Sequence, residues 1–452
     1  SVSAFLLNRS SDLAMMVYMI IRLCIPPSAR YLGFSLNTIA LAIFIILSYK
    51  QLYSNWQQKN VVQNKYVKNL FLYIVTIYAL SVISSVTASV VPIHTQLAAF
   101  TQFAYTELFP SVIIMLFLCK DDDVRLFNYV LWGGAAFASS YAIFTFFTQS
   151  NPLVEMFATS ETINDLEMNA EQSRGLLKGT GVGLLNDKIT TSIVEMLFFT
   201  YFWSCRYINK FLKIIILIIS SVSLLLTSQR SAMICLLFFI FCMVMSGKNK
   251  IKKIIIVSLV IVALIFAASI YFEQFDLLVN VLFAVVFIWD DGMQERLGVG
   301  GSTMELRIGQ LFAVFKIVGI HILEDVGYDI QNHRELLNVS SSTLEALAGL
   351  ESIIFMAIAQ SGLIGLWAMV RMYYKNWKLL SSVTISKSKI YEFAFYSSFF
   401  ITVVMTDYSG SCYLFFVLLV LNMKSRMMMS NQVNNFNNES CTCNMVSGYR
   451  RS

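Results

Sequence analysis

The sequence predicts an all-α polytopic integral membrane protein, and both its composition and the form of its apolar runs lead to this fold class. Of its 452 residues, 57% are hydrophobic and 13% are charged, whereas a soluble domain carries about 25% charged residues. The mean hydropathy is +0.66. Only helices and closed barrels satisfy their backbone polar groups in lipid. The apolar runs are continuous instead of alternating, which favours helices.

The apolar runs divide the chain into about twelve expected transmembrane helices, because a helix needs about 20 mostly apolar residues to cross a bilayer. A further apolar stretch at 277–289 is too short to cross and is expected to be interfacial or re-entrant. In chain order we expect spans at 12–29, 33–52, 69–91, 97–119, 126–148, 187–205, 213–229, 231–247, 254–273, 351–373, 388–407 and 410–423.

Lysines and arginines gather in every second loop between these spans. Basic residues in short loops favour the cytoplasmic side, so we expect both termini in the cytoplasm. The long intervals 149–186 and 274–350 then lie on the opposite, outward face. The transmembrane domain is expected to cover 1–426, followed by a disordered, Asn- and Ser-rich cytoplasmic tail at 427–452. The net charge of +6 follows from these loops and does not indicate nucleic-acid binding.

No cofactor or metal site is expected from the sequence. It contains no glycine-rich P-loop and no His-Glu-x-x-His motif. The acidic run 121–123 lies between basic residues and is typical of a solvated loop. Cys441 and Cys443 have no histidine near them, and neither outward interval contains a cysteine that could form a disulfide.

The first outward interval places Arg174 and Lys178 among several glycines. Glycines let a bulky anion approach the backbone closely, which suits a phosphate. An ordinary flexible loop has the same composition, so both interpretations stay open. Arg230 lies in the short break TSQRSA between two spans. An arginine at this position either extends to the membrane interface or faces a polar cavity.

The second outward interval contains an expected amphipathic helix at 305–323, because apolar residues recur there at spacings of three and four. This helix carries Arg307 and is expected to lie on the outer membrane surface. Gly327 marks the turn that follows it. The planar guanidinium group of an arginine binds phosphate oxygens in pairs, so Arg307 is a candidate for contact with a lipid-linked diphosphate.

The TSQRSA break, the long outward interval with Arg307 and Gly327, and the following ESIIFMAIAQSGLIGLW together resemble the O-antigen ligase and Wzy-type O-antigen polymerase superfamily. Its members are GT-C-type glycosyltransferases of the bacterial inner membrane with a periplasmic active site. The resemblance covers 174–367, and the first five expected spans match only in number and hydropathy.

The resemblance implies transfer of a glycan between undecaprenyl-diphosphate-linked oligosaccharides, without a nucleotide sugar or a metal. It implies that Arg174 and Arg307 hold the diphosphate, with Arg230 as a third arginine. Ligases generally place a histidine where this chain has Glu351-Ser352, which favours a polymerase. Glu351 is then the candidate general base.

Alternative interpretations remain for several of these residues. A carboxylate at the start of a helix, as at Glu351, is also favourable without any catalytic role. His333 is a candidate for a supporting role, as is Gly327, although a solvated loop histidine is the simpler interpretation of His333.

The leading hypothesis is a repeat-unit polymerase that makes an O-antigen, a capsule or an exopolysaccharide, with membrane lipid and a chain-length regulator as further partners. The first alternative keeps the fold but changes the acceptor, which makes the chain a ligase onto the lipid A core of lipopolysaccharide or onto a surface glycan. The second is of another class, a lipid-linked oligosaccharide flippase or transporter. Transporters usually show internal repeats and charges at mid-membrane, and the chain has few such charges, at Arg22, Glu107 and Glu195.

Overall fold

The fold was analysed in a computed structural model. It describes residues 2–26, 29–31, 33–58, 61–87, 89–118, 121–148, 150–157, 184–185, 188–227, 229–246, 296, 304–323, 326–330, 332–348, 350, 352–384, 388–406 and 412–429. Most of these residues are helical, and seven of the described helices are long and apolar enough to cross a membrane. The structure is therefore that of an all-α membrane protein.

The expected spans that fall within the described residues coincide with helices. The number twelve and the GT-C architecture stay predictions, and the expected segments 254–273 and 277–289 lie outside the described residues. In chain order the helices of the bundle are α1 (Val2–Cys24), α2 (Leu36–Gln57), α3 (Val61–Thr87), α4 (Ile93–Phe103), α5 (Phe109–Phe117), α6 (Asp121–Thr148), α9 (Lys188–Ser204), α10 (Lys210–Thr227), α11 (Arg230–Met245), α17 (Ile353–Val383), α18 (Lys389–Met405) and a last helix, Cys412–Met429.

The remaining elements are short. A two-residue hairpin, β1 (Arg30–Tyr31) and β2 (Phe34–Ser35), leads into α2, and Ser35 caps that helix by accepting from the Thr38 amide at 3.2 Å. A π-helix, η1 (Ala104–Leu108), joins α4 to α5. The other short elements are α7 (Pro152–Phe157), α15 (Met304–Val318), the 3-10 turns η2 (Gly319–His321) and η3 (Arg334–Leu336), and α16 (Ser341–Ala348).

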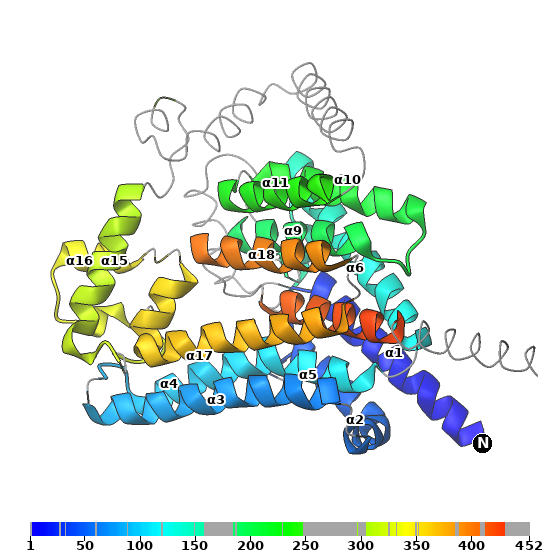
Figure 1. Ribbon diagram of the computed structural model, residues 1–452, viewed down its shortest axis with the longest axis horizontal. Helices are drawn as coiled ribbons and strands as arrows, with labels where there is room; N and C mark the ends of the chain where they lie inside the picture. The colour runs from blue at the N-terminus through cyan, green and yellow to red at the C-terminus, as the bar shows by residue number, and fades with distance from the viewer. Residues whose placement is uncertain are drawn as a thin grey trace, which may run out of the picture.

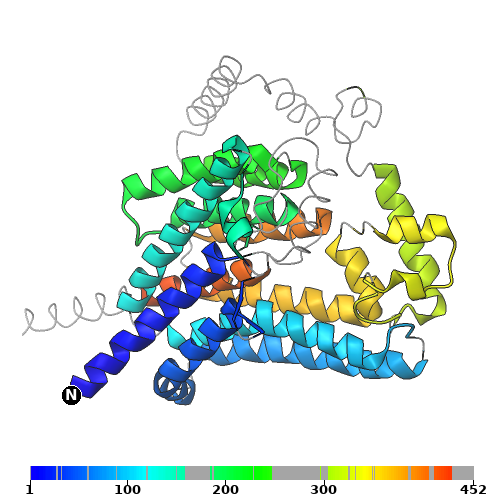
Figure 2. The same ribbon diagram turned by 180° about the vertical axis from the view of Figure 1, so that it is seen from behind.

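The long helices lie side by side as a bundle, and α15 with α16 lies at one end of it (Figures 1 and 2). Within the bundle, α1 packs against α2 and α6, α17 packs against α3, α10 packs against α9 and α6, and α11 packs against α18. In both views α15 runs across the ends of the long helices. The helix expected at 305–323 is thus confirmed as a helix over Met304–Val318, followed by η2, and its place on the outer membrane surface stays a prediction.

The core is rich in aromatic side chains and centres on the last helix, in which every residue of 412–424 is buried. The ring of Phe415 stacks on that of Phe399 in α18, with centroids 3.8 Å apart. Phe416 stacks on Tyr373 of α17 at 5.8 Å. These contacts join α17, α18 and the last helix into one packed unit, because aromatic pairs at such distances contribute beyond simple area burial.

Candidate functional site

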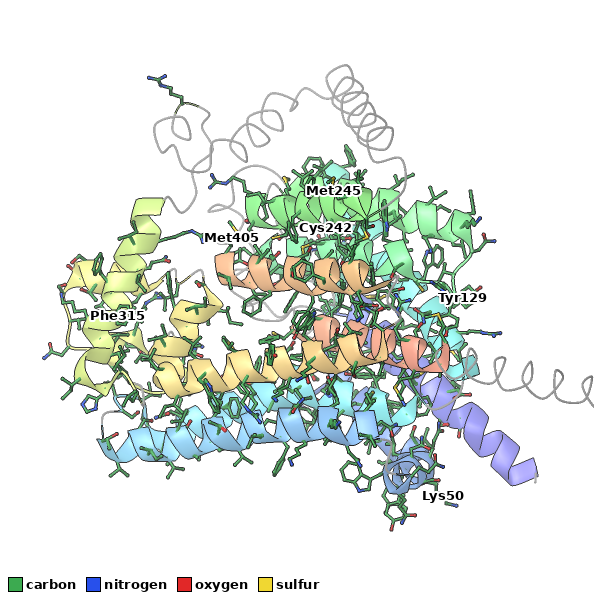
Figure 3. All side chains as sticks on the ribbon, in the orientation of Figure 1. Lys50, Tyr129, Cys242, Met245, Phe315 and Met405 are labelled. Carbon is green, nitrogen blue, oxygen red and sulfur yellow. The ribbon has the colours of Figure 1, made fainter. Side chains whose placement is uncertain are left out.

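Arg307 connects the helix that crosses the end of the bundle with one of the bundle helices. Its Nη2 donates a hydrogen bond of 2.8 Å to the backbone oxygen of Met405, the last residue of α18. The last carbonyl groups of a helix lack partners within the helix and carry partial negative charge. The half-buried guanidinium group therefore stabilises the end of α18, which Figure 3 marks at Met405.

Arg230 is the first residue of α11, the neighbour of α18. The two helices run antiparallel, since Met245 at the end of α11 lies away from Met405 (Figure 3). Ser398 donates to the carbonyl of Cys235 at 3.3 Å, which fixes their register. A helix rises about 1.5 Å per residue, so Arg230 lies about 7.5 Å along α11 from Cys235, and Met405 lies about 10.5 Å along α18 from Ser398. Because the helices are antiparallel, both distances run toward the same end of the bundle. Arg230 is therefore level with the residue that Arg307 contacts.

The position of α15 is fixed by a break in α17. Gly362 has φ 61° and ψ −169°, which no helix allows. The break leaves the amides of Leu363 and Ile364 without helical acceptors, as at a helix N-terminus. They donate instead to the carbonyls of Ile322 at 2.8 Å and Leu323 at 3.3 Å, just after η2. The amides freed by the break in α17 and the carbonyls that follow η2 are thus hydrogen-bonded to each other.

Gly327 fixes the following turn against the connection between α3 and α4. Its φ is +133°, and a Cβ atom there would lie 2.8 Å from Ser89 Oγ. On either side of it, the Val90 amide donates to Val326 O at 2.9 Å and the Tyr328 amide donates to Gln96 Oε1 at 3.0 Å. Burial raises the pKa of Tyr328 well above its ordinary value. In these contacts Gly327 acts as a packing residue.

His333 lies in the loop between α15 and α16, half-buried between two acidic side chains. Its Nε2 is 3.7 Å from Asp329 Oδ2, and its Nδ1 is 3.6 Å from Glu335 Oε1. These partners fit the interpretation of His333 as a solvated loop histidine. No described contact joins it to Arg307 or Arg230.

Arg174 and Glu351 both lie outside the described residues. The residue after Glu351, Ser352, is the N-cap of α17, and its hydroxyl accepts from the Ile354 amide at 3.3 Å. Of the residues predicted for the site, the structure therefore brings Arg230 and Arg307 to the same end of the bundle. The roles of Arg174 in diphosphate binding and of Glu351 as general base stay predictions.

Inside the bundle, two pairs of charges that the sequence showed only singly lie next to each other. Arg22 of α1 pairs with Glu107 of η1 at 3.0 Å, and Glu107 Oε2 accepts from the Tyr413 amide at 2.6 Å. The guanidinium carbon of Arg22 lies 4.8 Å from the centre of the Tyr413 ring. A second pair joins Glu392 and Arg426 at 2.9 Å. In the sequence, such a pair can be expected where two apolar runs each contain a single charged residue and the two charges are opposite.

Comparison with known proteins assigns no family to this arrangement. No protein-family model matches the chain, and no curated protein matches its sequence.

Proposed function

We propose that the chain is a polysaccharide repeat-unit polymerase of the bacterial inner membrane, with its active site on the periplasmic face and both termini in the cytoplasm. One observation carries the proposal: two arginines from separate elements, Arg230 and Arg307, lie at the same end of an apolar helix bundle. At the start of α11, a guanidinium group adjoins helix amides that favour anions. This combination suits a diphosphate at a membrane surface.

In the proposed reaction, a hydroxyl oxygen at the non-reducing end of a fresh lipid-linked repeat attacks the anomeric carbon of the growing chain. The bond from that carbon to the diphosphate oxygen breaks, and undecaprenyl diphosphate leaves. Arg174 and Arg307 hold the diphosphate, with Arg230 in support, and stabilise the charge that develops on it. Glu351 accepts the proton of the attacking hydroxyl.

Two alternatives make different predictions for the same chain. A ligase would use a similar site but transfer finished polymer to another acceptor, and Glu351-Ser352 in place of a histidine argues against it. A flippase or transporter is favoured by the broken helix α17 and by the buried carboxyl group of Glu195, because transporters often combine interrupted helices with ionisable residues inside the membrane. Against this, the break at Gly362 is satisfied by the loop carbonyls and not left open to a ligand.

The test replaces Arg307 by Ala in cells whose own copy is deleted, and follows glycan length on gels together with the lipid-linked intermediates. We expect long polymer to be lost and single repeats to accumulate on the carrier at the periplasmic face. Arg307→Lys keeps the charge but not the paired donors, so a partial loss is expected. Lys316→Ala is the matched control, because Lys316 lies on the same helix and bonds Thr343 Oγ1 at 3.2 Å.

The outcomes separate the three functions. Single repeats that stay at the cytoplasmic face would indicate a flippase. Finished polymer that stays on the lipid carrier would indicate a ligase. Unchanged polymer in Arg307→Ala, with the variant present in the membrane at normal level, would show that the proposed diphosphate clamp is wrong.

A further inference from the structure

Glu195 is a buried carboxyl group in the interior of α9 that the proposed glycan transfer does not use. Its side chain is 0% exposed. Among the described residues, the ion pairs involve other carboxylates, and no arginine, lysine or histidine pairs with Glu195. An unpaired carboxylate in a dry interior is very costly. Glu195 is therefore neutralised either by a proton or by a bound cation.

Three hydroxyl groups from the two neighbouring helices surround this carboxyl group. Ser139 of α6 donates to Glu195 Oε2 at 2.7 Å. Ser220 and Ser223 of α10 face the same carboxyl group closely enough to interact with it. All three serines are fully buried. The cluster is therefore an oxygen-lined site enclosed by α6, α9 and α10.

Several oxygens of the cluster lack ordinary hydrogen bonds. In the described part of the chain, Glu195 Oε1 and the hydroxyls of Ser220 and Ser223 form no hydrogen bond of normal length and angle. Serine and threonine hydroxyls inside helices usually bond to a carbonyl one turn earlier. Ser221 on the same helix does so, donating to Leu217 O at 2.7 Å. Ser220 and Ser223 thus lack the hydrogen bond to a helix carbonyl that Ser221 makes.

We propose that Glu195, Ser139, Ser220 and Ser223 form an intramembrane binding site for a monovalent cation, with sodium as the ion to test. Hard cations take oxygen ligands, and one carboxylate charge balances one positive charge. A proton on Oε1 could be donated to one serine hydroxyl and would leave the other hydroxyl without a partner, whereas a cation between them can contact all three oxygens. The site does not depend on the proposed glycan transfer, because the ion would bind in either case.

The experiment measures the thermal unfolding midpoint of the purified full-length chain in detergent as NaCl replaces choline chloride at constant ionic strength. A ligand that binds only the folded state raises stability with the logarithm of its concentration. We expect sodium to raise the midpoint of the wild type, and Glu195→Gln to lose this response. Ser223→Ala should weaken the apparent sodium affinity by about tenfold. Ser221→Ala is the matched control and should respond as the wild type does.

Direct binding of radioactive sodium provides a second measurement in case Glu195→Gln does not fold, since Ser223→Ala then remains informative. Sodium binding that is lost in Glu195→Gln and weakened in Ser223→Ala supports the site. A wild type that neither binds sodium nor gains stability from it overturns the proposal. So does a sodium response that survives in both variants, or a stability that depends on pH and not on sodium, which would assign the neutralising charge to a proton.

Discussion

At the scale of single residues, Gly327 combines a positive φ with close neighbours on two sides. A side chain there would meet Ser89 and Val91 of the connection between α3 and α4, with closest approaches of 2.8 and 3.0 Å. Its φ of +133° is also one that residues with a side chain rarely adopt. The contact holds the segment that follows α15 against the connection between α3 and α4. Gly327 therefore affects the site through the placement of α15.

Gly327→Ala is expected to destabilise the folded chain by about 1–3 kcal/mol, because a strained backbone conformation is added to a steric clash. The measurement is thermal unfolding of the purified chain. Gly309→Ala is the matched control, since Gly309 lies within α15 and a Cβ atom there meets nothing within 4 Å. That change should be neutral or stabilise by up to about 1 kcal/mol. Equal midpoints for the two variants would contradict the packing role of Gly327.

At the scale of elements, α17 is two helices that meet at Gly362, and the second half begins where the chain of α15 and η2 ends. Its first amides bond the carbonyls of Ile322 and Leu323. A continuous α17 would close its own hydrogen bonds and leave these carbonyls without donors. The break thus attaches the segment that follows α15 to α17.

Gly362→Ala should weaken this attachment, because the conformation at Gly362 is essentially restricted to glycine and costs about 1–3 kcal/mol for other residues. Hydrogen exchange in the full-length chain would report it as faster exchange at Leu363 and Ile364. Gly133→Ala in α6, where a Cβ atom meets nothing within 4 Å, is the control and should leave both amides unchanged. Protection equal to the wild type in Gly362→Ala would refute the attachment.

At the scale of the whole molecule, buried ion pairs connect the beginning of the chain with its end. Arg22 of α1 and Glu107 of η1 form a pair whose carboxylate also accepts from the amide of Tyr413 in the last helix. The last helix is held again by Arg426 and Glu392 of α18. Elements hundreds of residues apart in the sequence are therefore joined by polar contacts inside the apolar bundle.

Removing one member of the pair, in Arg22→Met or Glu107→Gln, should destabilise the chain by about 3–5 kcal/mol, because the other charge stays buried without its partner. The double variant should be less destabilised than the sum of the two. Lys50→Met, on the exposed side of α2, removes a charge without breaking a buried pair and serves as the control. Thermal unfolding of the four variants measures the coupling, and strictly additive effects would count against it.

The sequence predicted the helices well because the bilayer demands long apolar runs, and it predicted α15 because its apolar residues repeat at helical spacing. It did not predict η1 or the break at Gly362, since both depend on neighbours far along the chain. The positions of Arg230 and Arg307 at one end followed from the alternation of spans. The contact of Arg307 with Met405 did not, because a backbone carbonyl has no sequence signature. The partners of Glu195 depend on how three helices are rotated about their axes.

The burial of the last helix, Cys412–Met429, has a consequence for biosynthesis. This helix lies against α1, α17 and α18, yet it is the last of the described helices to leave the ribosome. Until it is inserted, the aromatic faces that it covers have only lipid or each other to contact. A nascent chain interrupted before 412 would therefore expose the Arg22 and Glu107 pair and the rings of Phe399 and Tyr373. A protease of the membrane could recognise such a chain as unfinished.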